Sequence, residues 1–134
     1  MDAYLSTSWE LTANERSILE WLLHDSRISD VETLRAQIPH ARVVAEREQM
    51  PTYLNLAVSG TAPAKVKDGP LPGGATVVST SGQTTGGLIL WVASGYLDFI
   101  EHWWVTDDVP LEFPAVDRLR PFRPEEDLNG RTAE

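Results

Sequence analysis

The segment from Gly86 to Thr106 restricts the fold more than any other part of the sequence. It holds two apolar runs, Leu88–Val92 and Tyr96–Ile100, on either side of Ser94-Gly95. A pair of this kind between two runs rich in β-branched and aromatic residues is typical of a two-residue hairpin turn, which needs backbone angles that glycine adopts readily. The sequence therefore predicts an antiparallel β-hairpin at the centre of the fold.

A two-residue turn assigns every hairpin residue to one of two faces, because strand side chains alternate. One face is apolar except for one carboxylate and carries Leu88, Leu90, Val92, Leu97, Phe99 and Glu101. The other face carries Ile89, Trp91, Ala93, Tyr96, Asp98, Ile100, His102 and Trp104. A β-bulge near Ile100 or Glu101 would exchange the faces beyond it. Both faces are apolar enough to require cover.

The second face is our prediction for a contact surface, since exposed Trp and Tyr residues dominate binding energies at protein interfaces. The predicted partner-binding residues are Trp91, Tyr96, Asp98, Ile100, His102 and Trp104. The alternative is that these aromatic residues fill the core. Either the loop 59–75 or another protein is expected to cover this face.

Glu101 has two interpretations. On an apolar face its charge would be disfavoured by desolvation, which favours a buried structural anchor paired with Arg35 or Arg42. Alternatively, Glu101 and His102 could form an acid–base pair, but consecutive strand residues point to opposite faces and do not easily share a substrate. The structural interpretation is preferred.

Two helices are predicted before the sheet. Thr12 and Glu15 form a capping box, and the apolar stripe that follows extends to about His24. The same signature returns at Ser29 and Glu32, and Pro39 ends this second, shorter helix.

Further strands are predicted at 41–45, 53–58 and 76–80, the first two as antiparallel neighbours. With the hairpin, the expected fold class is α+β: two N-terminal helices packed on an antiparallel sheet of about five strands in hairpin or meander order. Residues 1–120 are expected to form a single domain, and 121–134 a disordered or loosely docked tail. The Gly- and Pro-rich stretch 59–75 is expected to be a long surface loop that is functional or mobile.

Charge and composition exclude several classes of function. The formal net charge of -9 disfavours binding to nucleic acid or to an anionic membrane, but could attract a basic protein. The chain contains no cysteine, which fits a reducing compartment, and it shows neither a signal peptide nor an apolar run long enough to cross a bilayer. We expect a cytoplasmic protein whose partner is another protein or a second copy of itself.

No motif predicts a metal, a cofactor or a catalytic residue. His24, His40 and His102 lack the spacing of a zinc site, and no nucleophile elbow or phosphate-binding loop occurs. Enzymatic activity is therefore the less favoured alternative.

One resemblance comes from the hairpin itself. Its residues are Gly87-Leu88-Ile89-Leu90-Trp91-Val92 and Gly95-Tyr96-Leu97-Asp98-Phe99-Ile100-Glu101, followed by Trp104 and Asp107-Asp108-Val109-Pro110. This pattern resembles small uncharacterised bacterial α+β proteins with a G-Y-L-x-x-[LI]-E hairpin, some of them similar to immunity proteins of polymorphic toxin systems. The resemblance covers about a fifth of the chain and implies a cytosolic protein that binds and occludes a toxin. It assigns no catalytic or binding residue.

Overall fold

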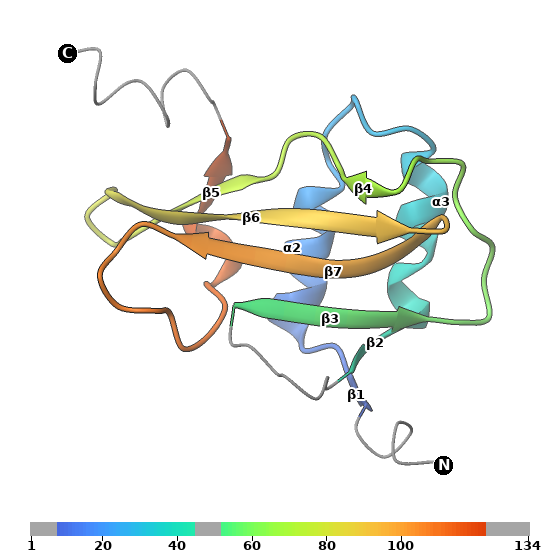
Figure 1. Cartoon of the computed structure of the whole chain (residues 1–134), viewed down its shortest axis with the longest axis horizontal. Coiled ribbons are helices and arrows are strands. Elements are labelled where there is room, and N and C mark those ends of the chain that lie inside the picture. The colour runs from blue at the N-terminus through green and yellow to red at the C-terminus, as the bar shows by residue number, and fades with distance from the viewer. Residues whose placement is uncertain (1–7, 45–51, 123–134) are drawn as a thin grey trace.

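The computed structural model describes residues 8–44 and 52–122 and has two layers (Figure 1). Two α-helices, α2 (Ala13–Leu22) and α3 (Val31–Ala36), lie against one face of an antiparallel sheet. The strands are β1 (Ser8–Glu10), β2 (Ala41–Val44), β3 (Tyr53–Val58), β4 (Gly69–Pro70), β5 (Ala75–Val78), β6 (Thr84–Ala93), β7 (Tyr96–Trp104) and β8 (Leu119–Pro121). Two 3-10 helices, η1 (Ile38–His40) and η2 (Val116–Arg118), complete the described elements. The α+β class is as predicted.

The described sheet has eight strands, so the prediction of about five was too low. Its order is β1-β2-β3-β7-β6-β5-β8, and β4 pairs with β6 beside this path. The three missed strands, β1, β4 and β8, are only two or three residues long. Strands of two or three residues are too short to show an alternation of apolar and polar residues. Pairing with a longer neighbouring strand holds them extended, and their own sequence does not reveal this. β8 includes Pro121, the first residue of the predicted tail, whereas 123–134 lie outside the described residues.

The first predicted helix is confirmed, and its capping box is present. The Glu15 amide donates to Thr12 Oγ1 at 3.1 Å, and the Thr12 amide donates to Glu15 Oε1 at 2.9 Å. The second capping box is wrong. Helix α3 begins after Asp30, whose φ of 54° is left-handed and whose side chain does not cap the helix.

Asp30 instead fixes the long loop to the start of α3. Its carboxylate accepts from the Lys65 amide at 2.8 Å and from Thr33 Oγ1 at 2.8 Å. These hydrogen bonds, that of the Lys65 amide above all, lower the pKa of Asp30 because they favour the charged carboxylate.

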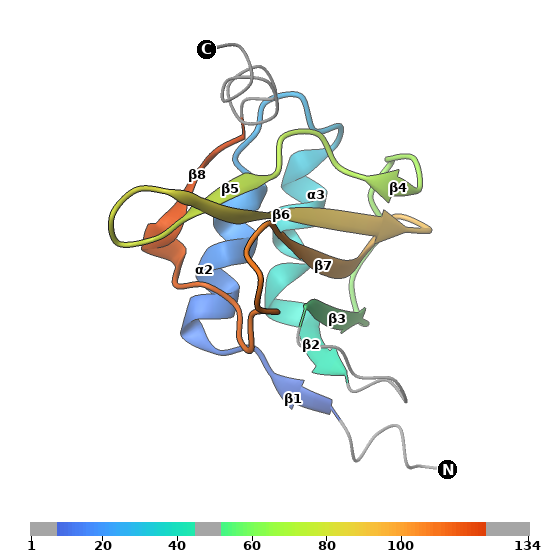
Figure 2. The ribbon, with the colours of Figure 1, turned by 60° about the vertical axis from the view of Figure 1, so that its left-hand side comes forward.

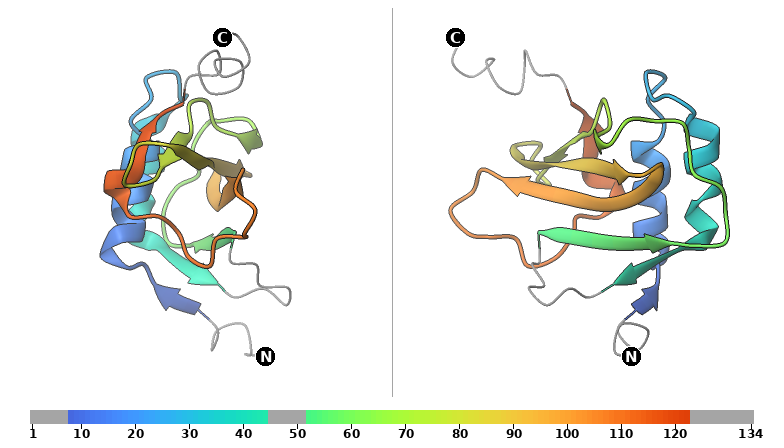
Figure 3. Two further views of the ribbon diagram at one scale, coloured as in Figure 1. Left: turned by 90° about the vertical axis from the view of Figure 1, so that its left-hand side faces the viewer. Right: turned by 45° about the vertical axis from the view of Figure 1, so that its right-hand side comes forward.

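The core lies between the helices and the inward face of the hairpin (Figure 2). The helices contribute Ile18, Leu19, Leu22 and Leu34, and the hairpin contributes Leu88, Leu90, Val92, Leu97 and Ile100, all buried. Figure 3 shows the helices on one side of the strands and no described segment covering the opposite side of β3, β7 and β6. The helices therefore cover one face of the hairpin only.

The turn prediction is correct, but the register beyond it is not. Ser94 and Gly95 both have positive φ, 54° and 84°, as a two-residue turn requires. Val92 pairs with Leu97, but Trp91 then pairs with Phe99, so Asp98 is the extra residue of a β-bulge. The bulge lies closer to the turn than Ile100 or Glu101, where one was considered. Every β7 residue beyond it therefore lies on the opposite face from the one predicted.

Glu101 is consequently not a buried charge, and that prediction was wrong. It pairs with Ile89 on the outward face and is half-buried. Neither predicted arginine bonds it: Arg35 Nη1 donates to Leu23 O at 2.8 Å, and Arg42 donates to Ser8.

The stretch 59–75 wraps the hairpin tip instead of covering the outward face (Figure 1). The Ala64 amide donates to Gly95 O, the Leu71 amide donates to Leu90 O, and Asp68 Oδ1 accepts from the Ser94 amide. These bonds close the loop around the turn and along the edge of β6.

Gln37 links the end of α3 to the same tip. Its side chain is fully buried, and Nε2 donates to Gly95 O at 2.8 Å and to Ala62 O at 3.1 Å. The amide of Leu97 donates to Gln37 Oε1 at 3.0 Å. One side chain thus bonds both sides of the turn and the loop around it.

Candidate functional site

The outward side of the sheet carries a stack of three aromatic rings that crosses β3, β7 and β6. The rings of Tyr53 and Phe99 have centroids 5.3 Å apart at an interplanar angle of 23°, and those of Phe99 and Trp91 lie 5.4 Å apart at 10°. We call Tyr53, Trp91, Phe99 and Glu101 the aromatic face. Tyr53 is 37% exposed, and the other three residues are half-buried.

The register explains how these side chains meet. Tyr53 pairs with Glu101, and Phe99 pairs with Trp91, so all four point to the same side. Neighbouring side chains on one face of a sheet are close enough for aromatic rings to stack. The bulge at Asp98 is essential, because without it Phe99 and Glu101 would point toward the helices.

Glu101 is held at the edge of this stack by a hydrogen bond. Trp91 Nε1 donates to Glu101 Oε1 at 3.1 Å. Within the described chain no basic side chain bonds this carboxylate, and β3, β6 and β7 contain no lysine or arginine. The aromatic face is therefore mainly apolar, with one carboxylate at its border.

The six predicted partner-binding residues do not form one surface. Trp91 belongs to the aromatic face, and Asp98 is the bulge residue. Tyr96 lies at the tip, where its hydroxyl donates to Thr61 O at 3.1 Å. The other three lie on the face of β7 that the bulge turns toward the core. Ile100 is fully buried, His102 is 5% exposed, and Trp104 is 36% exposed.

Sequence reasoning missed Tyr53 and Phe99. The alternation of β3 places Tyr53 and Asn55 on one side, but the pattern does not reveal that β3 pairs with β7. Phe99 was assigned to the inward face, because a bulge at Asp98 leaves no trace in the pattern of apolar residues.

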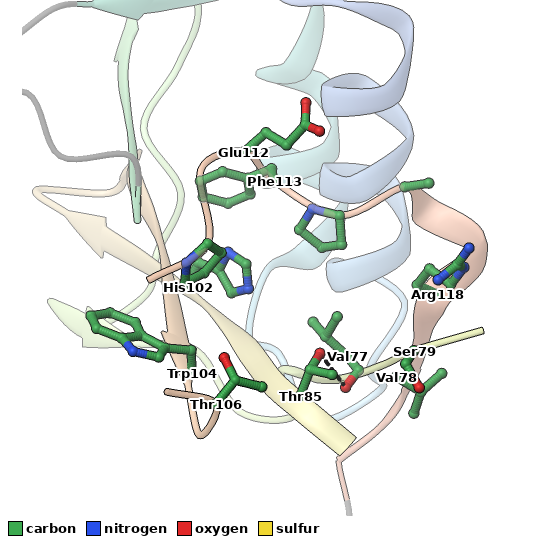
Figure 4. Close-up of a pocket in the computed structure, with 13 residues that line it drawn as sticks. Val77, Val78, Ser79, Thr85, His102, Trp104, Thr106, Glu112, Phe113 and Arg118 are labelled. Carbon is green, nitrogen blue, oxygen red and sulfur yellow. Dashed lines mark hydrogen bonds between the residues drawn. The ribbon is translucent and has the colours of Figure 1, made fainter. Parts of the chain in front are cut away.

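A cavity of about 400 Å³ lies at the opposite end of the hairpin from the turn (Figure 4). Its lining includes Val77, Val78, Thr85, His102, Trp104 and Phe113. Figure 4 shows the His102 imidazole between the side chains of Phe113 and Trp104. The rings of His102 and Phe113 have centroids 5.3 Å apart.

His102 is the unusual group of this cavity. Desolvation lowers its pKa, because burial disfavours the charged imidazolium. Its Nδ1 is buried and has no hydrogen-bond partner among the described residues. A buried polar atom without a partner costs about 1–3 kcal/mol, so such atoms are rare in folded proteins.

The segment 105–115, which lines one side of the cavity, is fixed to helix α2 by one side chain. Asn14 Nδ2 donates to Pro114 O at 2.9 Å, and Asn14 Oδ1 accepts from the Val116 amide at 2.9 Å. Phe113 and Val116 then pack against the core, whereas Leu111 is exposed. The cavity wall is thus anchored to the helical layer.

The described residues show no metal cluster, no membrane-spanning helix and no Glu101–His102 acid–base site. Residues 8–44 and 52–122 contain no group of three or more His, Asp or Glu side chains that could hold a metal ion. None of the helices in these ranges is long and apolar enough to cross a membrane. Glu101 and His102 lie on opposite faces of β7, so they do not form one acid–base site.

No protein-family model matches the chain, and searches of curated proteins and of solved structures likewise find no match.

Proposed function

We propose that this chain is a cytoplasmic protein-binding module of the immunity type, which occludes a basic partner protein through the aromatic face. The observation that carries the proposal is the stack of Tyr53, Phe99 and Trp91, bordered by Glu101, on a side of the sheet that the helices leave open. The hairpin's resemblance to small uncharacterised bacterial α+β proteins, some of them similar to immunity proteins, supports the same class of function.

The energetics favour this surface as an anchor. Trp and Tyr are enriched among interface residues whose removal costs about 2 kcal/mol or more. The three rings are already stacked, and the Trp91 indole is held by Glu101, so binding would order few rotatable bonds. A preorganised face is suited to a partner that is itself folded.

Charge favours a basic partner. An arginine side chain could lie on an aromatic ring and reach the Glu101 carboxylate, and such cation–π contacts contribute about 0.5–2 kcal/mol. The net charge of -9 would accelerate encounter with a positively charged protein.

A homodimer is the second candidate, since one aromatic face could pack on another. Two-fold packing of this small face would bring two Glu101 carboxylates close to each other, which is unfavourable without a cation between them. Light scattering after size exclusion separates the two: a concentration-independent monomer favours the hetero-partner, and a dimer that Glu101→Arg disrupts favours self-association.

The test uses the full chain with a photo-crosslinking phenylalanine analogue at position 99, in a lysate of its host. The matched control carries the analogue at Glu20, an exposed residue of α2 in the other layer. We expect one host protein to crosslink at position 99 and not at position 20, and to bind the purified chain. Crosslinking that is equal at both positions, or absent at position 99, would count against the proposal.

A further inference from the structure

The segment 106–113, which we call the strap, has few attachments to the rest of the fold. Just before it, the Val105 amide donates to Thr85 O at 3.0 Å, and just after it Pro114 O accepts from Asn14 Nδ2 at 2.9 Å. Between these two anchors, no hydrogen bond or ion pair among the described residues joins the strap to another element. Segments held by so few bonds open at a lower free-energy cost than core strands.

One aromatic side chain keeps the strap closed. Six of the eight strap residues are exposed, among them Val109 and Leu111, and only Pro110 and Phe113 are half-buried. Phe113 packs against the core, and the centroid of its ring lies 5.3 Å from that of the His102 ring. The strap is therefore closed by the contact between Phe113 and the imidazole (Figure 4).

The closed strap suits a neutral imidazole and not a charged one. His102 is 5% exposed, and its Nδ1 is buried with no hydrogen-bond partner among the described residues. A neutral ring can carry its proton on Nε2 and leave Nδ1 as an acceptor, whereas the imidazolium has an N–H on both nitrogens and a charge. The neighbouring rings of Trp104 and Phe113 offer a cation–π attraction, which is weaker than the hydration that a buried ion loses.

No nearby charge compensates for a proton on the ring. Glu112 and Arg118 are the charged residues among those described that line the cavity; Glu112 directs its carboxylate away from the imidazole, and Arg118 lies 3.8 Å from Asp117 (Figure 4). Strands β5 and β6 contain no titratable side chain, and in β3 Tyr53 belongs to the aromatic face. Helix α2 contributes no residue to the lining. Desolvation is accordingly the cause that lowers the pKa of His102.

We infer that the strap is a pH-sensitive device, which closes over the neutral His102 imidazole and opens when that ring takes up a proton. The two anchors stay bonded, so the rest of the fold is retained while the strap moves. Opening lets water reach the imidazolium and adds Phe113 to the exposed side chains of Val109 and Leu111. The strap thus presents a larger apolar surface in acid than at neutral pH, on a part of the molecule separate from the aromatic face.

The inference has a quantitative consequence. Because protonation favours the open strap, opening must favour protonation by the same factor. A single proton is taken up, so the equilibrium constant for opening rises at most tenfold for each unit by which the pH falls. A substitution that opens the strap at neutral pH must therefore raise the pKa of His102 toward its ordinary value of 6.5.

The experiment is NMR spectroscopy of the labelled full chain between about pH 7.5 and 5, the range in which histidines titrate. As the His102 ring titrates, we expect the strap's backbone order parameters to fall below about 0.6, while those of β6 and β7 stay near about 0.85. The nuclear Overhauser effect between Phe113 and the imidazole should disappear in the same range. His40→Phe, at an exposed histidine, should open as the parent protein does, whereas His102→Phe should stay closed.

Phe113→Ala tests the coupling in the opposite direction. It removes the side chain that closes the strap, so the strap should be mobile at both ends of the pH range, and the pKa of His102 should rise. A purely structural role of Phe113 would leave that pKa unchanged. This variant carries the test alone should His102→Phe not fold.

Four results would overturn the inference. One is a strap that stays ordered after the His102 ring has titrated. Another is opening of His102→Phe at the same pH as the parent protein, which would assign the effect to a different group. A third is loss of order in β6 and β7 together with the strap, which is global unfolding. The last is an unchanged pKa of His102 in Phe113→Ala.

Discussion

Trp91 Nε1 donates a hydrogen bond to Glu101 Oε1 at 3.1 Å across the β6–β7 pair. This bond sets the orientation of both groups at the edge of the aromatic stack, and the proposed function gives the same carboxylate a second role toward a basic partner. The two roles can be separated experimentally.

Glu101→Gln should leave the fold nearly unchanged, because the amide oxygen can still accept from the indole. We expect the free energy of unfolding in urea to change by less than about 0.5 kcal/mol, as for most surface substitutions. A loss above about 2 kcal/mol would mean that the charge itself stabilises the fold.

Gln37→Leu should destabilise the protein strongly. The leucine fills a similar volume but leaves the Leu97 amide without the acceptor Gln37 Oε1, and removes the bonds of Nε2 to Gly95 O, which keeps the Ala64 amide, and to Ala62 O. An unpartnered buried group costs about 1–3 kcal/mol and a lost hydrogen bond about 1 kcal/mol, so urea unfolding should show a loss of about 3 kcal/mol. Gln83→Leu, at an exposed turn, is the control and should change stability by less than about 0.5 kcal/mol. Equal effects of the two substitutions would contradict the role given to Gln37.

Gly95→Ala and Gly82→Ala form a matched pair that separates backbone strain from a steric clash. Both glycines have positive φ, 84° and 89°. A methyl group at position 95 would lie 2.6 Å from Ala64 O, whereas the space at position 82 is open. We expect a loss of about 1 kcal/mol at position 82 from strain alone, and about 3 kcal/mol at position 95. Equal thermal shifts would argue against close packing of the loop on the turn.

His102 should make stability depend on pH. Its folded pKa is lowered by desolvation, so between that pKa and the unfolded value near 6.5 the unfolded chain binds more protons. The stabilisation is present above the unfolded pKa and is lost as pH falls through this window, by at most about 1.4 kcal/mol per pH unit.

The control for this pH effect is another histidine. His102→Phe should flatten the dependence of unfolding free energy on pH between about 7.5 and 5, the region where histidines titrate. His40→Phe, at an exposed site, should keep the slope of the parent protein. A slope that survives His102→Phe would assign the effect to other groups.

Much of this fold was predictable because its signals are local. The Thr12–Glu15 capping box and the Ser94-Gly95 turn each depend on a few consecutive residues, and both are present. The strand 53–58 follows from simple alternation. These features required no knowledge of what packs against them.

The errors come from contacts between distant segments. One extra residue, Asp98, exchanged the faces of β7 and moved Glu101 and Phe99 outward. Gln37 and Asn14 bond backbone groups about 60 and 100 positions away, which no pattern near either residue indicates. The aromatic face was therefore predicted only in part. Its strands and Trp91 were identified, but the register that brings Tyr53, Phe99 and Glu101 beside Trp91 was not.

The most direct test of the proposed function is charge reversal on the aromatic face. The host protein that crosslinks at position 99 is purified, and its affinity is measured for the parent chain, Glu101→Arg and Glu20→Arg by calorimetry. Both variants change the net charge equally, so only position distinguishes them. We predict that Glu101→Arg weakens binding at least tenfold, about 1.4 kcal/mol, and that Glu20→Arg changes it less than threefold. Equal affinities for both variants would contradict binding through the aromatic face.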